Sequence, residues 1–197
     1  MIAFMPHYFG DSIYDRIDDF KEFETIEEMK EYLCNFWNIN NDITKDNIVI
    51  DNRLTYEDKR LGWKDTRHVC LKKGSKSIVI GYCATKYKNL EETINRLKIE
   101  KQESDAIVYL RFVIENMGCK NDFHLGEYAE QKVCLFKRDN LWEVYIVERG
   151  NIFDKTRHEK IDDACIEVIN KLSESIEISK KNKNKFLKLR KLTPNNN

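Results

Sequence analysis

Two strand-like runs separated by a turn constrain the fold of this chain more than any other stretch. The runs are KVCLFKR at 132–138 and WEVYIVERG at 142–150, and both are rich in Val, Ile, Tyr, Phe and Trp. Asp139 and Asn140 lie between them, and both residue types favour turns. A turn-prone pair between two such runs predicts a β-hairpin.

The hairpin is followed by the clearest amphipathic helix of the sequence, from about Lys160 to Leu172. Its apolar residues recur at helical spacing. They are Ile161, Ala164, Cys165, Val168, Ile169 and Leu172. Alternation in the second strand places Trp142, Val144 and Ile146 on one face and Glu143, Tyr145 and Val147 on the other. We expect the helix to cover the Trp142 face, because this removes both apolar surfaces from water.

The composition is that of a globular protein. The chain has 197 residues, of which 41% are hydrophobic, so it can bury a core. Its 34 Lys and Arg balance its 34 Asp and Glu, which removes the general electrostatic argument for a nucleic-acid binder. The sequence has neither an apolar run of about 18 residues nor a secretory signal pattern at its start. We therefore expect a cytoplasmic protein with no membrane partner.

The six cysteines are scattered without a CxxC pair. They are Cys34, Cys70, Cys83, Cys119, Cys134 and Cys165. Most lie in apolar strand or helix contexts, which is typical of small buried hydrophobes in a reducing compartment. A nucleophile made from Cys70 or Cys83 with His68 needs a polarised thiol, and these surroundings disfavour one. We expect no metal site, no cofactor and no catalytic residue.

The first half of the chain is predicted to be a helix followed by three strands. Thr25 with Glu28 has the pattern of a capping box, which places a helix start at Thr25. Strand-like runs occupy about 47–54, 66–72 and 77–84, with a turn at Lys73–Lys76 between the last two. Residues 55–65, between the first two strands, are expected to form a charged loop.

The second half repeats this plan. Cap signals at Asn89 and Ser104 predict one helix to about residue 100 and another to Met117, and a third strand is expected at about 151–155. The predicted fold class is α+β, with two similar helix-plus-three-strand antiparallel layers, a central helical segment between them, and a C-terminal helix. The expected domains are an α+β subdomain at 1–87, a helical connector with a second α+β subdomain at 88–173, and a basic helical tail at 174–197.

The strongest polar cluster runs from Asp65 to His68. With arginines nearby in the sequence it suggests a small-ligand or nucleotide site. The residues of that site would be Arg53, Arg60, Arg67 and His68. On a strand, however, Arg67 and His68 point in opposite directions. We therefore favour a solvated sheet face and keep the ligand site as the alternative.

Two other surfaces carry residue types that are frequent at protein interfaces. The first is the loop with Arg60, Trp63, Lys64 and Asp65, and the second is the strand end with Tyr145 and Arg149. We expect a protein partner to bind at one of them.

A basic segment lies near the end of the chain. It contains Lys180, Lys181, Lys183, Lys185, Lys188, Arg190 and Lys191. We expect the preceding helix to continue through it, so that these cations complement the dipole at a helix C-terminus. Nucleic-acid binding through this tail remains the less favoured reading.

Two pieces of the chain resemble known groups of proteins. Residues 8–85 are similar to small uncharacterised proteins of phages and prophages of Gram-positive bacteria. The shared features are YFGDSIYDRI, a helix ending in FW, and YEDKRLGWKDTRHVCLK followed by IVIGYC. Residues 127–173 resemble immunity proteins of bacterial polymorphic-toxin systems, in the strand WEVYIVERG and the following DDACIEVI. The resemblance implies a small cytoplasmic inhibitor that acts by binding, and it implies no catalytic residue.

These observations lead to one expectation and one alternative. We expect a non-enzymatic inhibitor or immunity factor, encoded by a phage, a prophage or a toxin–immunity locus, whose partner is a toxin or a host defence component. The alternative is an anti-defence protein that binds a small ligand or nucleotide and acts as a sponge.

Overall fold

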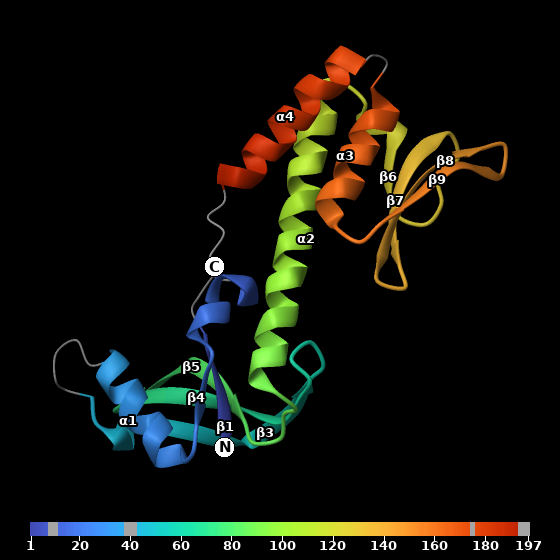
Figure 1. The fold of residues 1–197 in the computed structure, drawn as a ribbon. Coiled ribbons are helices and arrows are strands. Elements are labelled where there is room, and N and C mark those ends of the chain that lie inside the picture. The colour runs from blue at the N-terminus through green and yellow to red at the C-terminus, as the bar shows by residue number, and fades with distance from the viewer. Residues whose placement is uncertain (8–11, 38–42, 174–175, 193–197) are drawn as a thin grey trace. The chain divides into compact units, whose positions relative to one another are not determined.

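The computed structural model describes residues 1–7, 12–37, 43–173 and 176–192, apart from the side chains of 53, 54, 176, 177 and 192. The chain divides into two compact units, Met1–Glu100 (unit 1) and Lys101–Asn197 (unit 2), and the division lies inside the long helix α2 (Leu90–Met117) (Figure 1). The α+β class is confirmed. From the sequence we expected the first domain boundary after residue 87. Composition does not reveal that one helix contributes residues to both units.

Unit 1 is built on a five-stranded antiparallel sheet in the order β2-β1-β5-β4-β3. Its strands are β1 (Ile2–Pro6), β2 (Lys21–Phe23), β3 (Ile48–Asp58), β4 (Trp63–Lys73) and β5 (Lys76–Ala84). The last three correspond to the three strands expected from the sequence. The other two extend the sheet, because β1 pairs with β5 on one side and with β2 on the other.

Both faces of this sheet are covered. On one face, Ile2 and Phe4 pack in a cluster with Met29 and Leu33 of α1 (Ile26–Trp37). On the other face, Ala3 and Met5 of the same strand pack in a cluster that includes residues from η1 (Ile13–Asp19), a 3-10 helix, and from the first turns of α2. Alternating side chains of β1 therefore enter two different cores, which explains why every residue of the strand is buried.

Side-chain caps hold the helix starts of unit 1 as expected. Thr25 Oγ1 accepts the Glu28 N–H at 3.1 Å, and the Glu28 carboxylate accepts the Glu24 N–H at 2.8 Å. At the start of α2, Asn89 Oδ1 accepts the Glu92 N–H at 3.1 Å. The two helices expected at 89–100 and 104–117 are one helix, with Ser104 in its interior. A residue type that favours caps does not end a helix when good helix formers stand close on both sides, here Lys101, Gln102 and Glu103 before it and Ala106 after it.

The loop expected at 55–65 is mostly strand. β3 continues to Asp58 and β4 begins at Trp63, so only a short turn remains. The Asp58 carboxylate tightens this turn by accepting the N–H groups of Arg60 at 3.0 Å and Leu61 at 3.2 Å. Asp65 then has a positive φ of 51° at an irregularity in the β3–β4 pairing. This irregularity lets Trp63 and Thr66, three residues apart, both point inward and be buried.

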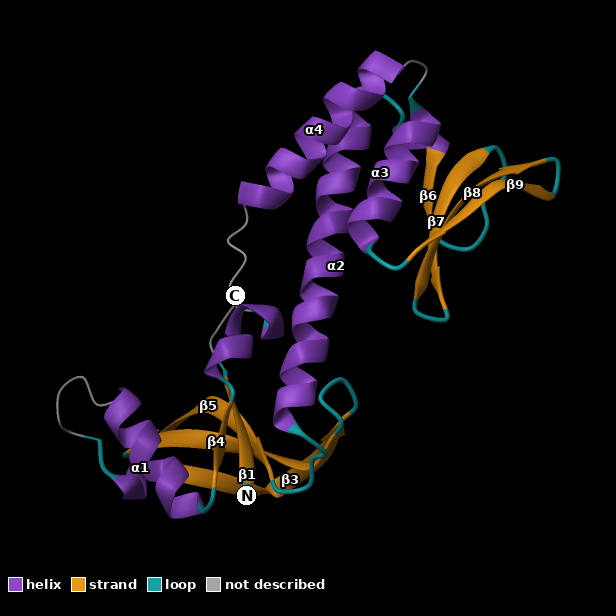
Figure 2. Ribbon diagram, viewed as in Figure 1, coloured by secondary structure: helices purple, strands orange, loops and turns teal. Residues whose placement is uncertain are grey.

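Unit 2 contains a four-stranded sheet in the order β6-β7-β8-β9 (Figure 2). Its strands are β6 (Phe123–Leu125), β7 (Lys132–Arg138), β8 (Leu141–Glu148) and β9 (Asn151–His158). β6 runs parallel to β7, and the other pairs are antiparallel. The predicted hairpin is confirmed, with positive φ at Asp139 and Asn140 in its two-residue turn. Arg149 and Gly150 have the same conformation in the next turn.

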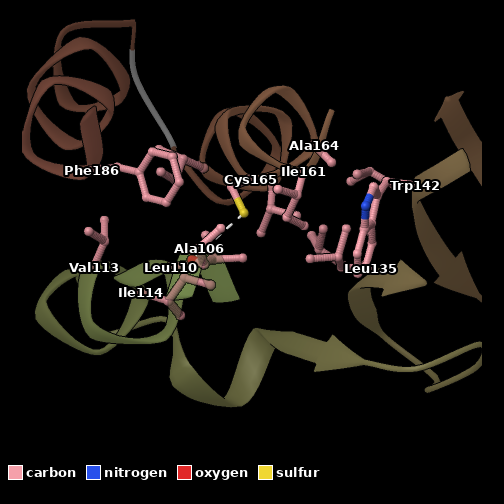
Figure 3. Close-up of a cluster of buried hydrophobic side chains, with 14 residues drawn as sticks. Ala106, Leu110, Val113, Ile114, Leu135, Trp142, Ile161, Ala164, Cys165 and Phe186 are labelled. Atoms are coloured by element: carbon pink, nitrogen blue, oxygen red, sulfur yellow. Dashed lines mark hydrogen bonds between the residues drawn. The ribbon is translucent and has the colours of Figure 1, made fainter. Parts of the chain in front are cut away.

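The core of unit 2 lies between one face of this sheet and three helical segments. They are the last part of α2, α3 (Ile161–Leu172) and α4 (Ile176–Leu192). The apolar stripe of α3 faces Leu135 and Trp142 of the sheet, as expected (Figure 3), and Val144 belongs to the same cluster. Phe186 of α4 completes the cluster. The C-terminal segment is therefore part of unit 2, and α4 is a new helix, because the backbone of Ser173 is extended where α3 ends.

We expect the Phe186→Ala variant to lower the free energy of unfolding of unit 2 by about 3–5 kcal/mol, because the substitution leaves a cavity in a packed core. Phe186 is 0% exposed. The neighbouring Leu187→Ala variant is the control, since Leu187 is 38% exposed and should cost less than about 1 kcal/mol. Urea unfolding followed by circular dichroism measures both values. Equal effects of the two substitutions would show that α4 is not anchored by Phe186.

Candidate functional site

A pocket of about 440 Å³ opens on the face of the unit 1 sheet that η1 covers. This volume is in the range of small-molecule sites. Its aromatic lining comes from His7, Tyr14, Tyr56 and Tyr82, and its charged lining comes from Arg16, Asp58 and Arg60. We call these seven residues the aromatic pocket. They come from the end of β1, from η1, from the end of β3 with its turn, and from β5.

The rings of His7, Tyr56 and Tyr82 form a continuous wall of the aromatic pocket together with His68. Tyr82 is its centre, with ring centroids 5.3 Å from His7, 6.4 Å from Tyr56 and 5.2 Å from His68. His68 lies directly opposite Tyr82 in the β4–β5 ladder and also contacts Tyr56 at 6.0 Å. All four contacts are edge-to-face. The rings therefore support one another and present apolar surface to the cavity.

The charged groups lie beside this wall. Arg60 has a side chain that is 69% exposed and is 3.8 Å from the Asp58 carboxylate, so its guanidinium is available to a ligand. Arg16 contacts Asp19 at 3.4 Å. Arg96 donates a hydrogen bond to the Arg60 carbonyl, which positions the turn that carries Arg60. The Tyr14 hydroxyl donates to Glu100 at 3.3 Å.

The phenols of the aromatic pocket are neutral at ordinary pH. Burial, followed by the proximity of Tyr82 and Asp58, raises the pKa of Tyr56 to about 12. Burial and Asp58 also raise the pKa of Tyr82, and burial with Glu100 raises that of Tyr14. The pocket thus offers hydroxyl groups, flat rings and arginines. This combination suits a small ligand with a planar group and a negative charge.

The structure separates the four residues of the expected ligand site. Arg60 lines the aromatic pocket, and His68 supports its wall through Tyr56 and Tyr82. Arg67 lies opposite Cys83, which packs under α1, so it belongs to the other face of the sheet. There it donates to the Asn52 side chain at 3.0 Å. The side chain of Arg53 lies outside the described residues.

The expected partner surfaces need two corrections. Trp63 is 0% exposed and packs in the core beneath η1 and α2, so it cannot meet a partner. Tyr145 is 1% exposed, and its hydroxyl donates to the Glu127 carbonyl. Both are large aromatic residues with a charged residue within two positions in the sequence, and a sequence pattern does not distinguish an interface aromatic from a core aromatic.

The remaining residues of these surfaces are accessible. Lys64 is exposed, and Asp65 forms an ion pair with Lys86 at 2.6 Å. The hydrogen bond from Lys86 lowers the pKa of the Asp65 carboxyl. Arg149 has a side chain that is 90% exposed at the tip of the β8–β9 hairpin. Glu130 accepts the N–H groups of Arg149 and Gly150 and so holds this tip in place.

Sequence reasoning did not identify His7, Tyr14, Tyr56, Asp58 or Tyr82 as site residues. The reason is clearest for Tyr82. Val69 pairs with Gly81 and Cys70 with Val79, so Ile80 is an extra residue in β5. This bulge lets Ile80 pack under α1 while Tyr82 faces the pocket. Strict alternation would have placed both side chains on one face.

Five of the six cysteines are buried, as the sequence predicts, and Cys119 is partly buried. Cys83 is buried under α1, and burial raises the pKa of its thiol to about 11. Cys70 lies opposite Val79 and Cys83 opposite Arg67, so the two are not cross-strand neighbours. Within the described residues, no three His, Cys, Asp or Glu side chains gather in a way that could hold a metal ion. None of the described helices is long and apolar enough to cross a membrane.

No family model, no curated protein and no solved structure matches this chain.

We expect the stability of unit 1 to fall as the pH rises from about 10 toward 12. The folded state holds Tyr56 protonated to a pKa of about 12, above its ordinary value of 10.0, so this contribution is present below pH 10 and lost above it. The Tyr56→Phe variant should therefore lose less stability over this interval than the wild type. Urea unfolding at a series of pH values measures the difference. An identical pH dependence in both proteins would contradict the assignment.

Proposed function

We propose that the protein acts by binding a small planar anion in the aromatic pocket, and that a nucleotide is the ligand class with the best fit. One observation carries the proposal: a wall of mutually supporting rings and two arginines line the same cavity. A nucleobase can stack on tyrosine and histidine rings, and phosphate oxygens accept paired hydrogen bonds from a guanidinium.

The chemistry of the buried nucleophiles supports binding without turnover. A cysteine or tyrosine that attacks a substrate needs its pKa lowered toward neutrality. In the aromatic pocket burial has the opposite effect, because it raises the pKa of Tyr56 to about 12 and also raises the pKa of Tyr82. A protein that holds a nucleotide without converting it acts as a sponge, which is the anti-defence alternative drawn from the sequence.

We expect isothermal titration calorimetry with a panel of nucleoside mono-, di- and triphosphates and cyclic dinucleotides to find one bound ligand class. The Arg60→Ala variant should bind it at least about tenfold more weakly, because a charge-assisted hydrogen bond contributes about 1.5–3 kcal/mol. Lys59→Ala is the matched control, since it removes the same charge from the next residue, which does not line the aromatic pocket.

A second measurement identifies the stacking surface. The Tyr56→Ala variant should lose affinity, whereas Tyr56→Phe should keep most of it, because the ring and not the hydroxyl supports the base. If no nucleotide binds, or if Lys59→Ala and Arg60→Ala weaken binding equally, the aromatic pocket is not the nucleotide site.

The inhibitor or immunity role is a second candidate, and the β8–β9 hairpin favours it. β9 is an edge strand, and its side chains Ile152 and Phe153 are 50% and 49% exposed. Arg149 projects from the tip beside them. An edge strand with exposed apolar side chains and an arginine is a surface that a protein partner can extend or cover.

We expect immobilised wild-type protein to retain a partner from a lysate of the source cells, and the Phe153→Glu variant to lose it. Ile78→Glu is the control, because Ile78 is similarly exposed on a strand of unit 1. Circular dichroism establishes that all three proteins are folded. Retention of the same partner by Phe153→Glu would exclude β9 as the binding edge.

A further inference from the structure

Positive charge is concentrated on α4. Residues 180–191 hold seven Lys and Arg and no Asp or Glu. Because the whole chain is neutral, the rest of it carries an equal excess of acidic residues. Balanced composition therefore conceals a strongly basic helix.

Packing determines which of these cations are available. Ser179 and Phe186 are buried, and Arg190 contacts Asp162 of α3 at 2.8 Å, so these residues mark the inner face of α4. The outer face carries Lys180, Lys181, Lys188 and Lys191, all exposed. We call these four residues the lysine face. Within the described part of the chain, none of the four has a carboxylate within ion-pair distance.

The helix dipole does not account for the lysine face. Cations stabilise the last turn of a helix, which fits Lys188 and Lys191. Lys180 and Lys181, however, follow the first turn of α4, which begins at Ile176. The dipole effect falls off within one turn of a helix end, so it does not stabilise cations at these two positions. The sequence predicted one continuous helix from Lys160 onward; because α3 ends at Leu172 and α4 begins at Ile176, Lys180 and Lys181 instead lie near the start of a helix.

Interactions with side chains three or four residues away on α4 do not explain the lysine face either. Lys181 and Lys185 are four residues apart, and Lys185, Lys188 and Lys191 follow one another at intervals of three. Like charges at these spacings are neighbours on a helix and repel each other. Lys185 lies over the ring of Phe112, 5.1 Å from its centroid, which shields only one of them. A polyanion would relieve this repulsion.

We infer that the lysine face binds the phosphate backbone of a nucleic-acid duplex. The lysines span seven to eleven residues, or roughly 10–16 Å at 1.5 Å per residue. This length is comparable with the width of a duplex groove of about 12 Å, so cations at its two ends can meet phosphates of both strands. Backbone contacts of this kind do not depend on base sequence.

The same face disfavours two other anionic partners. A helix that lies in a membrane surface needs a broad apolar side, and here the aromatic Phe186 is buried in unit 2, which leaves Ile178 and Leu187 as the exposed large apolar residues described on α4. Single strands are held by exposed aromatic rings on which bases stack. Phe186 is the only aromatic residue of α4 and cannot serve in this way. The inference does not depend on the aromatic pocket, which lies in unit 1.

Fluorescence anisotropy with the full chain and a labelled DNA duplex of about 20 base pairs tests this inference, with an RNA duplex of the same length in parallel. Four phosphate contacts predict that the affinity for DNA falls about 100-fold between about 50 and 200 mM salt. The Lys181→Glu/Lys188→Glu variant should bind at least about tenfold more weakly and reduce the salt dependence by about two phosphates. Lys181→Ala/Lys188→Ala is the milder variant if charge reversal alters folding.

The matched control is Lys72→Glu/Lys76→Glu, which makes the same charge change at two exposed positions of unit 1. It should bind duplex DNA within about twofold of wild type. The inference would be overturned if the wild type bound neither the DNA duplex nor the RNA duplex. Equal losses in the two charge-reversal variants would also overturn it, as would binding to phosphatidylserine vesicles without binding to duplexes.

Discussion

Unit 1 depends on the removal of both faces of its sheet from water. α1 covers one face, and η1 with the start of α2 covers the other, so β1 places Phe4 in one core and Met5 in the other. Where the second cover ends, Tyr56 and Tyr82 line a cavity instead of a core. Their rings keep the edge-to-face contacts of a packed interior while one side remains open. The candidate site is therefore the edge of the hydrophobic core, with Arg16 and Arg60 added at its rim.

Burial has a different consequence in unit 2, where it determines which charges are already paired. Glu143 is 2% exposed and is held by Lys155 at 2.7 Å and Arg157 at 3.0 Å. Lys171 is held by Asp154 and Glu167. Such contacts neutralise cations close to the core and leave the exposed lysines of α4 without partners among the described residues. Charge is therefore unevenly distributed over the surface of the folded chain, although the numbers of basic and acidic residues are equal.

Much of the local structure could be predicted from the sequence. The hairpin turn at Asp139–Asn140, the apolar stripe of α3 and the Thr25 cap all follow from interactions within a few residues. The site could not be predicted in the same way. Its residues come from four elements, and the bulge at Ile80 changes the face to which Tyr82 belongs. A bulge results from pairing between strands, which no short window of sequence contains.

The sequence by itself determined the α+β class, most strands and helices, and the buried character of Cys83, because periodicity and turn propensity act over a few residues. Only the tertiary structure decided that Trp63 and Tyr145 are core residues, since an aromatic side chain suits a core and an interface equally well. It also decided that α4 begins a new helix at Ile176 and packs through Phe186. The physical reason is the same in each case: burial depends on which distant segments meet, and contacts between distant segments are settled only when the whole chain is packed.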